Sequence, residues 1–256
     1  MEISFCSSYH YLMKTVSDPK LAIIIPAMNE GGSIASVITK IKAHFDCLVI
    51  VVDDASSDST AIIAKHNGAV VLPHTINLGA WRATQTGIRY ALKKGMERVI
   101  TCDADGQHPV EALLTLIESA PENNDCTIGA CTSRGSAGRH IAWRIFKRIS
   151  GLHVSDLTSG LRLYSRPAMR VLASTQATMF EYQDVGVLLM LKKLNMACSE
   201  VTVEMKQRED GISRIFHSWF AVFKYLLYTL ILSVTKIGPH EVAKYHKQLT
   251  AGAELE

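Results

Sequence analysis

Several features that mark common classes of protein are scarce or missing in this chain. Its six cysteines form no Cys-x-x-Cys pair, and its cysteines and histidines nowhere show the spacing of zinc ligands. No run of about 18 apolar residues occurs, which leaves no clear membrane span, and residues 1–20 lack the apolar stretch of a signal peptide. The net charge of +3 is too small to indicate nucleic acid as a partner. We therefore expect a cytoplasmic protein.

Two glycine-rich phosphate-binding motifs are absent as well. The chain contains neither the G-x-G-x-x-G motif of dinucleotide-cofactor enzymes nor the G-x-x-x-x-G-K-[ST] loop of nucleotide hydrolases. Its 256 residues suit one large domain, or one domain with a small appendage. The composition, with 48% hydrophobic and 20% charged residues, excludes global disorder. We interpret the cysteines at apolar, strand-like runs as small core residues in a reducing compartment. These are Cys47, Cys102, Cys126 and Cys198.

Short apolar runs alternate with segments of helical periodicity from residue 21 onward. Such runs are typical of strands buried on both faces, and the segments between them space apolar residues as amphipathic helices do. We expect an α/β fold with a mostly parallel central sheet and helices on both faces. The expected strands are 21–25, 48–52, 69–72, 98–102, 127–131, 161–164 and 198–205, and the expected helices are 33–44, 58–66, 79–94, 109–119, 142–152 and 182–194.

Polar clusters follow three of the expected strands. They are Pro26–Glu30, Asp53-Asp54 and Asp103–His108. In parallel sheets ligands bind outside the carboxyl ends of the strands. We therefore expect the three clusters to converge on one edge of the sheet.

The acidic clusters have chemistry that suits a metal ion and a nucleotide. Asp103 and Asp105 can share one hard cation, which could bridge a diphosphate and offset charge on a leaving group. One acid of Asp53-Asp54 can accept hydrogen bonds from a base or ribose, although a strand end followed by a capped helix explains part of this segment. The turn at 29–32 either brings backbone close to a nucleotide or leads into the next helix.

Four segments, in this order and at this spacing, closely resemble family 2 glycosyltransferases. They are Ile23–Glu30, Val51–Thr60, Asn77–Gly79 and Asp103–Pro109. Within that family, the chain is most similar over about residues 21–215 to the branch of dolichyl- and polyprenyl-phosphate mannose synthases. The resemblance implies a GT-A fold, a UDP- or GDP-type sugar donor, Mg²⁺ or Mn²⁺, and inversion at the anomeric carbon.

The resemblance also assigns roles on the donor side. Asp103, Asp105 and Gln107 would hold the metal ion. The residues that would bind the nucleotide are Pro26, Asn29, Glu30, Asp53, Asp54, Asn77, Gly79 and Asp103.

Three later segments resemble the acceptor side of the same branch, namely Asp156–Arg162, Phe180–Asp184 and Arg208–Arg214. Guanidinium groups bind phosphate well. Each segment also has an ordinary structural explanation. The first could be a polar loop, the second could carry acids at the start of a helix, and the third could be a solvated run of charges. The candidate acceptor- or phosphate-binding residues are Arg134, Arg139, Ser159, Arg162, Arg208, Ser213 and Arg214.

The need for a catalytic base depends on the acceptor. A polyprenyl phosphate brings an anionic nucleophile and needs no strong base, whereas a sugar hydroxyl of a glycan must lose its proton to a carboxylate. Asp184 is the first candidate for that base, followed by Glu181 and Asp156. A catalytically silent nucleotide-binding relative is the alternative to both transferases.

Trp81 and Arg82 depart from the family pattern, which usually has small residues after Asn77–Gly79. If they point into the donor site, they narrow it or contact the sugar or diphosphate. If they point outward, they are surface features of the expected helix.

Residues 215–236 predict an amphipathic helix whose apolar side chains recur every three or four residues, interrupted by Lys224. It suits a core or homo-oligomer contact, or docking on a membrane surface. The basic segment 134–148 favours anionic lipid or a lipid phosphate. We divide the chain into an N-terminal extension (1–20), a GT-A domain (21–214), this helix and a polar tail (237–256). Membrane attachment would be at most peripheral, at the cytoplasmic face.

Overall fold

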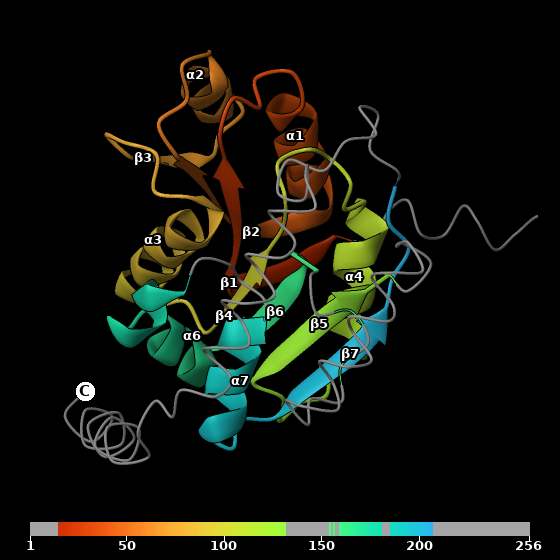
Figure 1. The fold of residues 1–256 in the computed structure, drawn as a ribbon. Coiled ribbons are helices and arrows are strands. Elements are labelled where there is room, and N and C mark those ends of the chain that lie inside the picture. The colour runs from red at the N-terminus through yellow and green to blue at the C-terminus, as the bar shows by residue number, and fades with distance from the viewer. Residues whose placement is uncertain (1–14, 132–153, 155, 157–158, 181–184, 207–256) are drawn as a thin grey trace, which may run out of the picture.

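The computed structural model describes residues 15–131, 154, 156, 159–180 and 185–206, which form a sheet with helices on both faces (Figure 1). The expected helices at 142–152 and 215–236 lie outside these residues. None of the described helices is long and apolar enough to cross a membrane.

The described strands form one sheet in the order β3-β2-β1-β4-β6-β5-β7. Strand β6 is antiparallel to its neighbours β4 and β5, and every other pairing is parallel. The expectation of a mostly parallel sheet is therefore confirmed. The strands are β1 (Val16–Ala27), β2 (Phe45–Asp53), β3 (Val70–Pro73), β4 (Arg98–Thr101), β5 (Cys126–Ala130), β6 (Arg162–Ser165) and β7 (Cys198–Thr202).

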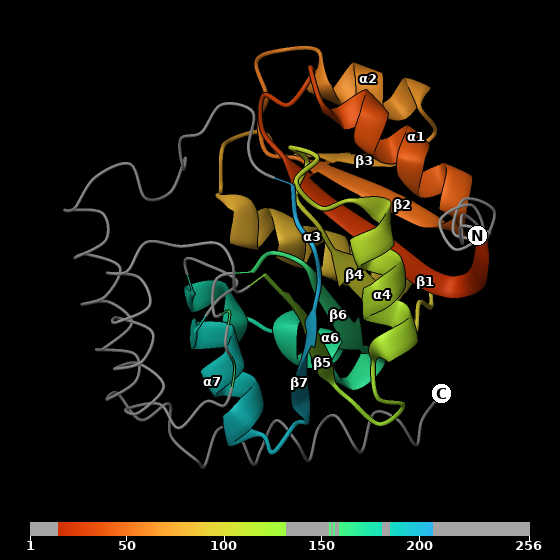
Figure 2. The same cartoon turned by 90° about the vertical axis from the view of Figure 1, so that its right-hand side faces the viewer.

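Helices cover both faces of this sheet (Figure 2). One face carries α1 (Ile34–His44), α2 (Thr60–His66) and α4 (Val110–Ser119). The other carries α3 (Ala80–Lys93), α6 (Arg166–Leu172), the 3-10 helix η2 (Gln176–Met179) and α7 (Val185–Lys193). The layers follow from the connections, because a parallel strand can be reached only by a crossover, which here is a helix.

Two apolar cores lie on the two sides of the sheet. Along β1, Ala22 and Ile24 face the core under α3, α6 and α7, whereas Leu21, Ile23 and Ile25 face the core under α1 and α4. All five side chains are fully buried. Because successive side chains of a strand point to opposite faces, a continuous apolar run of this kind requires cover on both sides.

The main differences from the expected elements lie at the edges and in the second half of the chain. Strand β1 begins at Val16 rather than at 21, and β7 ends at Thr202 rather than at 205. Helices α6 and η2 were not predicted. They are too short for a clear apolar period, although the Ser165 hydroxyl caps α6 by accepting from the Ala168 amide at 3.4 Å, a signal readable from Ser-Arg-Pro in the sequence.

Helix α3 lies directly against β1 at Gly87. A Cβ placed on Gly87 would stand 2.4 Å from Cγ2 of the fully buried Ile24. We expect Gly87→Ala to lower the free energy of unfolding by about 1–3 kcal/mol through overpacking, measured by urea denaturation. Gly32→Ala is the matched control, because no atom lies within 4 Å of its added methyl. Equal stability of the two variants would contradict this close packing.

Candidate functional site

The loops that follow β1, β2, β3 and β4 lie at one edge of the sheet. Strands β1 to β4 are mutually parallel where they pair, so their carboxyl ends share that edge. The acidic clusters after β2 and β4 and the polar segment after β1 all belong to these loops. The convergence expected from the sequence is therefore present.

The loops after β1 and β2 are joined by hydrogen bonds. The Asn29 amide donates to the Ser56 hydroxyl at 2.9 Å, and Asn29 Oδ1 accepts from the Ser57 amide at 2.8 Å. Asn29 has a φ of 55°, a left-handed conformation that asparagine tolerates better than most residues. The described contacts of Asn29 thus shape the turn, and its neighbour Glu30 donates its amide to the Thr60 hydroxyl at 2.8 Å.

Asp58 completes this connection between the two loops. Its Oδ2 accepts from the Gly31 amide at 3.0 Å, and its Oδ1 accepts from the Thr60 amide at 2.9 Å and from the Thr60 hydroxyl. The hydrogen bond from that hydroxyl lowers the pKa of the Asp58 carboxyl. A charged Asp58 therefore holds the turn after β1 against the start of α2.

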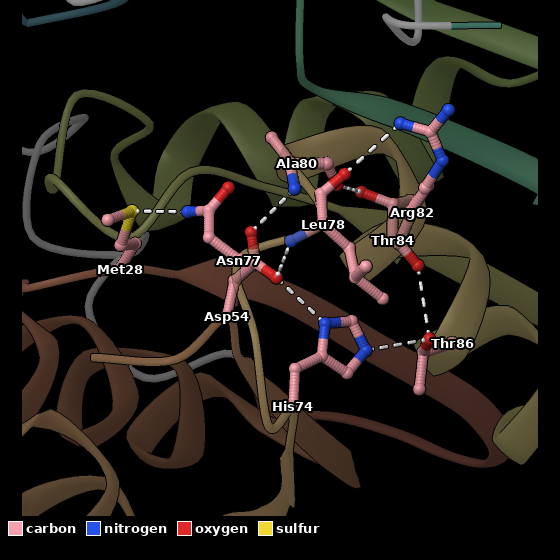
Figure 3. Close-up of polar contacts among 10 residues, drawn as sticks. Met28, Asp54, His74, Asn77, Leu78, Ala80, Arg82, Thr84 and Thr86 are labelled. Atoms are coloured by element: carbon pink, nitrogen blue, oxygen red, sulfur yellow. Dashed lines mark hydrogen bonds and ion pairs between the residues drawn. The ribbon is translucent and has the colours of Figure 1, made fainter.

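Asp54 organises the loop that leads from β3 into α3 (Figure 3). Its Oδ1 accepts from the Leu78 amide at 2.9 Å, and its Oδ2 accepts from the Gly79 amide at 2.8 Å. Its Oδ1 also lies 2.8 Å from Nδ1 of His74. Both oxygens of this 3% exposed residue are occupied by the protein itself. Asp54 therefore builds the site by positioning backbone.

His74 was not among the residues singled out in the sequence. A carboxylate can only accept, so His74 donates from Nδ1 to Asp54, and its Nε2 lies 3.0 Å from the Thr86 hydroxyl on α3. Its own amide donates to the Asp53 carbonyl at 2.8 Å. His74 thus joins the ends of β2 and β3 to α3. Nothing in its local sequence marks this role, because the contacts span three elements.

The neighbouring carboxylate, Asp53, has a different environment. Asp53 is 6% exposed, and its buried Oδ1 has no hydrogen-bond partner among the described residues. Burying a carboxylate oxygen without a partner costs free energy, so such an atom at a site is a signature of an absent hydrogen-bond donor. Of the two adjacent acids, Asp53 is the one with an oxygen left for a ligand.

Asn77 and Gly79 lie in the loop that Asp54 holds. Asn77 Nδ2 donates to Met28 Sδ at 2.7 Å, which joins this loop to the turn after β1. Gly79 has a φ of 89°, which an L side chain rarely adopts, and it is the N-cap of α3. Pro26 lies on β1 opposite Val52 of β2, one residue before the strand ends.

Trp81 adopts neither of the two orientations considered for it. It is 1% exposed, packs in the core under α3, and donates from its indole nitrogen to the Ala177 carbonyl of η2 at 2.7 Å. Arg82 is half-buried and donates from Nη1 to the Leu78 carbonyl at 3.2 Å. The large residue after Gly79 is therefore a core residue that docks η2 on α3.

The loop after β4 holds Asp103 and Asp105. The Asp103 amide donates to Nδ1 of His108 at 3.0 Å, while the Asp103 side chain is 46% exposed, with Oδ2 3.8 Å from Nε2 of His108. Asp105 Oδ1 accepts from the Gln107 amide at 3.0 Å, and Gly106 between them has a φ of 75°. The loop therefore presents the Asp103 carboxylate to solvent, with the Asp105 carboxylate two residues away.

Space around Asp103 depends on the absence of a side chain at Gly160. A Cβ there would stand 2.8 Å from Asp103 Oδ1 and 3.1 Å from Oδ2. The described residues contain no group of three or more acidic, histidine or cysteine side chains that could hold a metal. Mg²⁺ and Mn²⁺ fit two carboxylates nevertheless, because hard cations often complete their shell with water and substrate phosphate. The donor set thus suits a divalent cation shared with a diphosphate.

Gln107 joins this loop to the segment that follows β7. Its side chain is buried, and its backbone carbonyl accepts from the Lys206 amide, just beyond β7, at 2.9 Å.

Two candidate acceptor residues make internal contacts. Ser159 Oγ donates to the Gly129 carbonyl at 2.5 Å, and the fully buried Arg162 donates from Nε to the Ser159 carbonyl at 3.0 Å. Asp156, a candidate base, is 7% exposed, with Oδ2 3.4 Å from the Cys131 amide. The remaining candidates lie outside the described residues: Arg134, Arg139, Glu181, Asp184, Arg208, Ser213 and Arg214.

A sequence model described as glycosyl transferase family 2 matches residues 22–174. The chain belongs to this family, and the resemblance inferred from its motifs is confirmed. It is similar to the UDP-N-acetylglucosamine–dolichyl-phosphate N-acetylglucosaminyltransferase of Methanococcus voltae, at 28% identity over 78% of this chain and 90% of the relative. It is also similar to the polyprenol monophosphomannose synthase of Mycolicibacterium smegmatis, at 26% identity over 75% of this chain and 80% of the relative.

Solved structures confirm the GT-A fold. Glucosyl-3-phosphoglycerate synthase from Mycobacterium tuberculosis, in complex with Mn²⁺, UDP-glucose and phosphoglyceric acid, superposes with a TM-score of 0.63. The two chains are 19% identical, and the match covers 83% of this chain and 79% of the other. Another structure of that enzyme contains Mg²⁺ and UDP, with a TM-score of 0.62.

Because the two adjacent acids have different environments, we expect their isosteric variants to differ in the free energy of unfolding. Asp54→Asn should lower the free energy of unfolding by about 2–3 kcal/mol, because a backbone amide or His74 loses a charged acceptor. Asp53→Asn should change it by less than about 1 kcal/mol, or raise it, because a buried charge is removed. Urea denaturation measures both. A larger loss for Asp53→Asn than for Asp54→Asn would refute this division.

Proposed function

We propose that this glycosyltransferase moves a sugar from a nucleotide diphosphate to a polyprenyl phosphate, with inversion and with Mg²⁺ or Mn²⁺. One observation carries the proposal. Asp53, whose buried Oδ1 has no described partner, lies at the same edge of the sheet as Asp103 and Asp105, the two carboxylates of the loop after β4. Relatives named as polyprenyl- and dolichyl-phosphate transferases support the acceptor.

On the donor side, Asp53 would accept a hydrogen bond from the nucleoside. Asp103 and Asp105 would hold the divalent cation, with Gln107 as a further candidate ligand. The cation would supply positive charge to the diphosphate as it leaves. Asp54, His74 and Asn29 would act earlier, since they hold the loops in the shape that receives the donor before it binds.

On the acceptor side, a phosphate oxygen would attack the anomeric carbon opposite the diphosphate. The new bond joins that carbon to the acceptor oxygen, the bond to the diphosphate breaks, and the nucleoside diphosphate leaves with the electron pair. No proton has to be removed from a phosphate anion, so no general base is required. Arg134, Arg139, Arg208 and Arg214 are the candidates for positioning the phosphate; Asp184, Glu181 and Asp156 gain a role as base if the acceptor is a sugar hydroxyl.

A polyprenyl chain resides in a bilayer, so the enzyme must work at its surface. Residues 215–236 and the basic segment 134–148 are the parts of the sequence suited to that contact. We infer peripheral attachment at the cytoplasmic face, where nucleotide sugars are present.

Thermal unfolding with UDP, GDP, CDP and dTDP, each with and without Mn²⁺, tests the donor side. A bound nucleotide at about 100 times its dissociation constant should add about 2.7 kcal/mol of apparent stability. We expect one nucleotide to stabilise the protein, and to do so more strongly with Mn²⁺. Transfer of radiolabelled sugar from the matching donor to undecaprenyl phosphate, rather than to a glycan hydroxyl, tests the acceptor. Stabilisation by none of the four would contradict the proposed donor site, and stabilisation without transfer to any acceptor would favour the silent relative.

The metal assignment predicts a specific loss. Asp105→Asn should reduce Mn²⁺-dependent transfer by at least about a hundredfold, because one of two anionic ligands is lost. Its free energy of unfolding should stay within about 1 kcal/mol of the wild type. Glu111→Gln, on the exposed side of α4, removes a nearby carboxylate and should retain full activity. Wild-type turnover by Asp105→Asn would exclude Asp105 as a ligand.

A further inference from the structure

Two cysteines from distant parts of the chain stand directly opposite each other. Cys126 is the first residue of β5, Cys198 is the first residue of β7, and the two are register partners in this parallel pair. Register partners on adjacent strands point to the same face, so both thiols lie on one side of the sheet. Cys126 belongs to the core under α7, and Cys198 packs against that core.

The two thiols differ in exposure. Cys126 is fully buried, whereas Cys198 is half-buried on β7, the last strand in the order of the described sheet. A small oxidant can therefore reach Cys198 first. Burial keeps Cys126 behind it as a second thiol.

The two facing thiols have different polar surroundings, and Cys198 Sγ donates to the Met196 carbonyl at 3.7 Å. The facing Cys126 thiol lowers the pKa of Cys198 by acting as a hydrogen-bond donor toward it, and the nearby Arg162 guanidinium on β6 acts in the same direction, against burial and the Asp125 carboxylate. Burial, and after it the facing Cys198, raises the pKa of Cys126. The thiolate is the reactive form of cysteine, so a lowered pKa makes Cys198 the more reactive thiol of the pair.

We propose that Cys126 and Cys198 form a peroxide-reactive dithiol that closes to a disulfide between β5 and β7. The Cys198 thiolate attacks the peroxide O–O bond, giving Cys198 sulfenic acid and releasing hydroxide. The Cys126 sulfur, losing its proton, then attacks the Cys198 sulfur and displaces hydroxide, giving the disulfide and water. Hydrogen peroxide is the two-electron oxidant, and the two thiols together lose two electrons and two protons.

The spacing of the two strands is compatible with a disulfide at this pair. Neighbouring strands lie about 4.8 Å apart, which falls within the range of about 4.4–6.8 Å between the Cα atoms of disulfide-bonded cysteines. Because Cys198 is only half-buried, a small thiol reductant can reach the bond and open it again. A reversible bond of this kind is a redox modification site rather than a permanent structural link.

The pair lies away from the candidate donor site. Strand β5 runs in the same direction as β4, because β6 is antiparallel to both. As first residues of β5 and β7, the cysteines lie at the amino-terminal edge, opposite the edge that holds Asp53 and Asp103. The proposal therefore does not rest on the proposed function.

Peptide mapping after treatment with stoichiometric hydrogen peroxide tests the site. All proteins carry Cys6→Ser, because Cys6 lies outside the described residues. We expect a linked peptide containing Cys126 and Cys198, a mass loss of about 2 Da, and reversal by dithiothreitol. Cys126→Ser should leave Cys198 sulfenic acid to be trapped by dimedone, and Cys198→Ser should leave Cys126 unoxidised.

Cys47→Ser is the matched control. Burial raises the pKa of Cys47 to about 12, so that half-buried thiol should not react and its removal should leave the linked peptide unchanged. Linkage that persists in Cys126→Ser, or preferential oxidation of Cys47 or Cys102, would overturn the proposal.

A second measurement needs no variant at the pair. In the reduced protein with Cys6→Ser, iodoacetamide at neutral pH should label Cys198 at least about tenfold faster than Cys47, because the thiolate reacts. Equal labelling rates would contradict the assignment of Cys198 as the nucleophile even if a pair variant fails to fold.

Discussion

The candidate site depends on one buried carboxylate, that of Asp54. Its oxygens accept from the amides of Leu78 and Gly79 and from His74, which otherwise would be polar groups without partners near the core. Three connections meet there: the end of β2, the loop after β3 and the start of α3. Because these backbone groups cannot pair within a helix or a sheet, the loop keeps its shape only while the carboxylate is in place.

This arrangement leaves neighbouring acids with separate functions. The Asp54 carboxylate accepts hydrogen bonds from other groups of the protein, whereas Asp53 keeps a buried oxygen without a described partner. The loop after β4 shows a similar division, because the Asp105 carboxylate accepts from its own loop while the Asp103 carboxylate is half exposed beside Gly160. A buried oxygen without a partner carries a cost that ligand binding can recover, and Asp53 Oδ1 lies at the carboxyl edge, where ligands of parallel sheets bind.

The cysteines show how a correct local interpretation can miss an arrangement. Reading Cys126 and Cys198 as small core residues agrees with the burial of the first and the packing of the second. Their separation in the sequence gives no sign that they are opposite each other. Only the parallel register of β5 and β7 brings the thiols together. Trp81 is a similar case, since its partner is the Ala177 carbonyl of a short helix with no clear period.

The sequence by itself determined the family, the alternation of strands and helices, and the strand ends that carry the acidic clusters. Those features are local, because buried strands need apolar runs and the motifs are contiguous. The tertiary structure decided which acid of Asp53-Asp54 is occupied, brought in His74, and buried Arg162 and Trp81. The physical reason is that hydrogen-bond partners and burial are set by elements far apart in the chain, and such pairings leave no trace in spacing or composition.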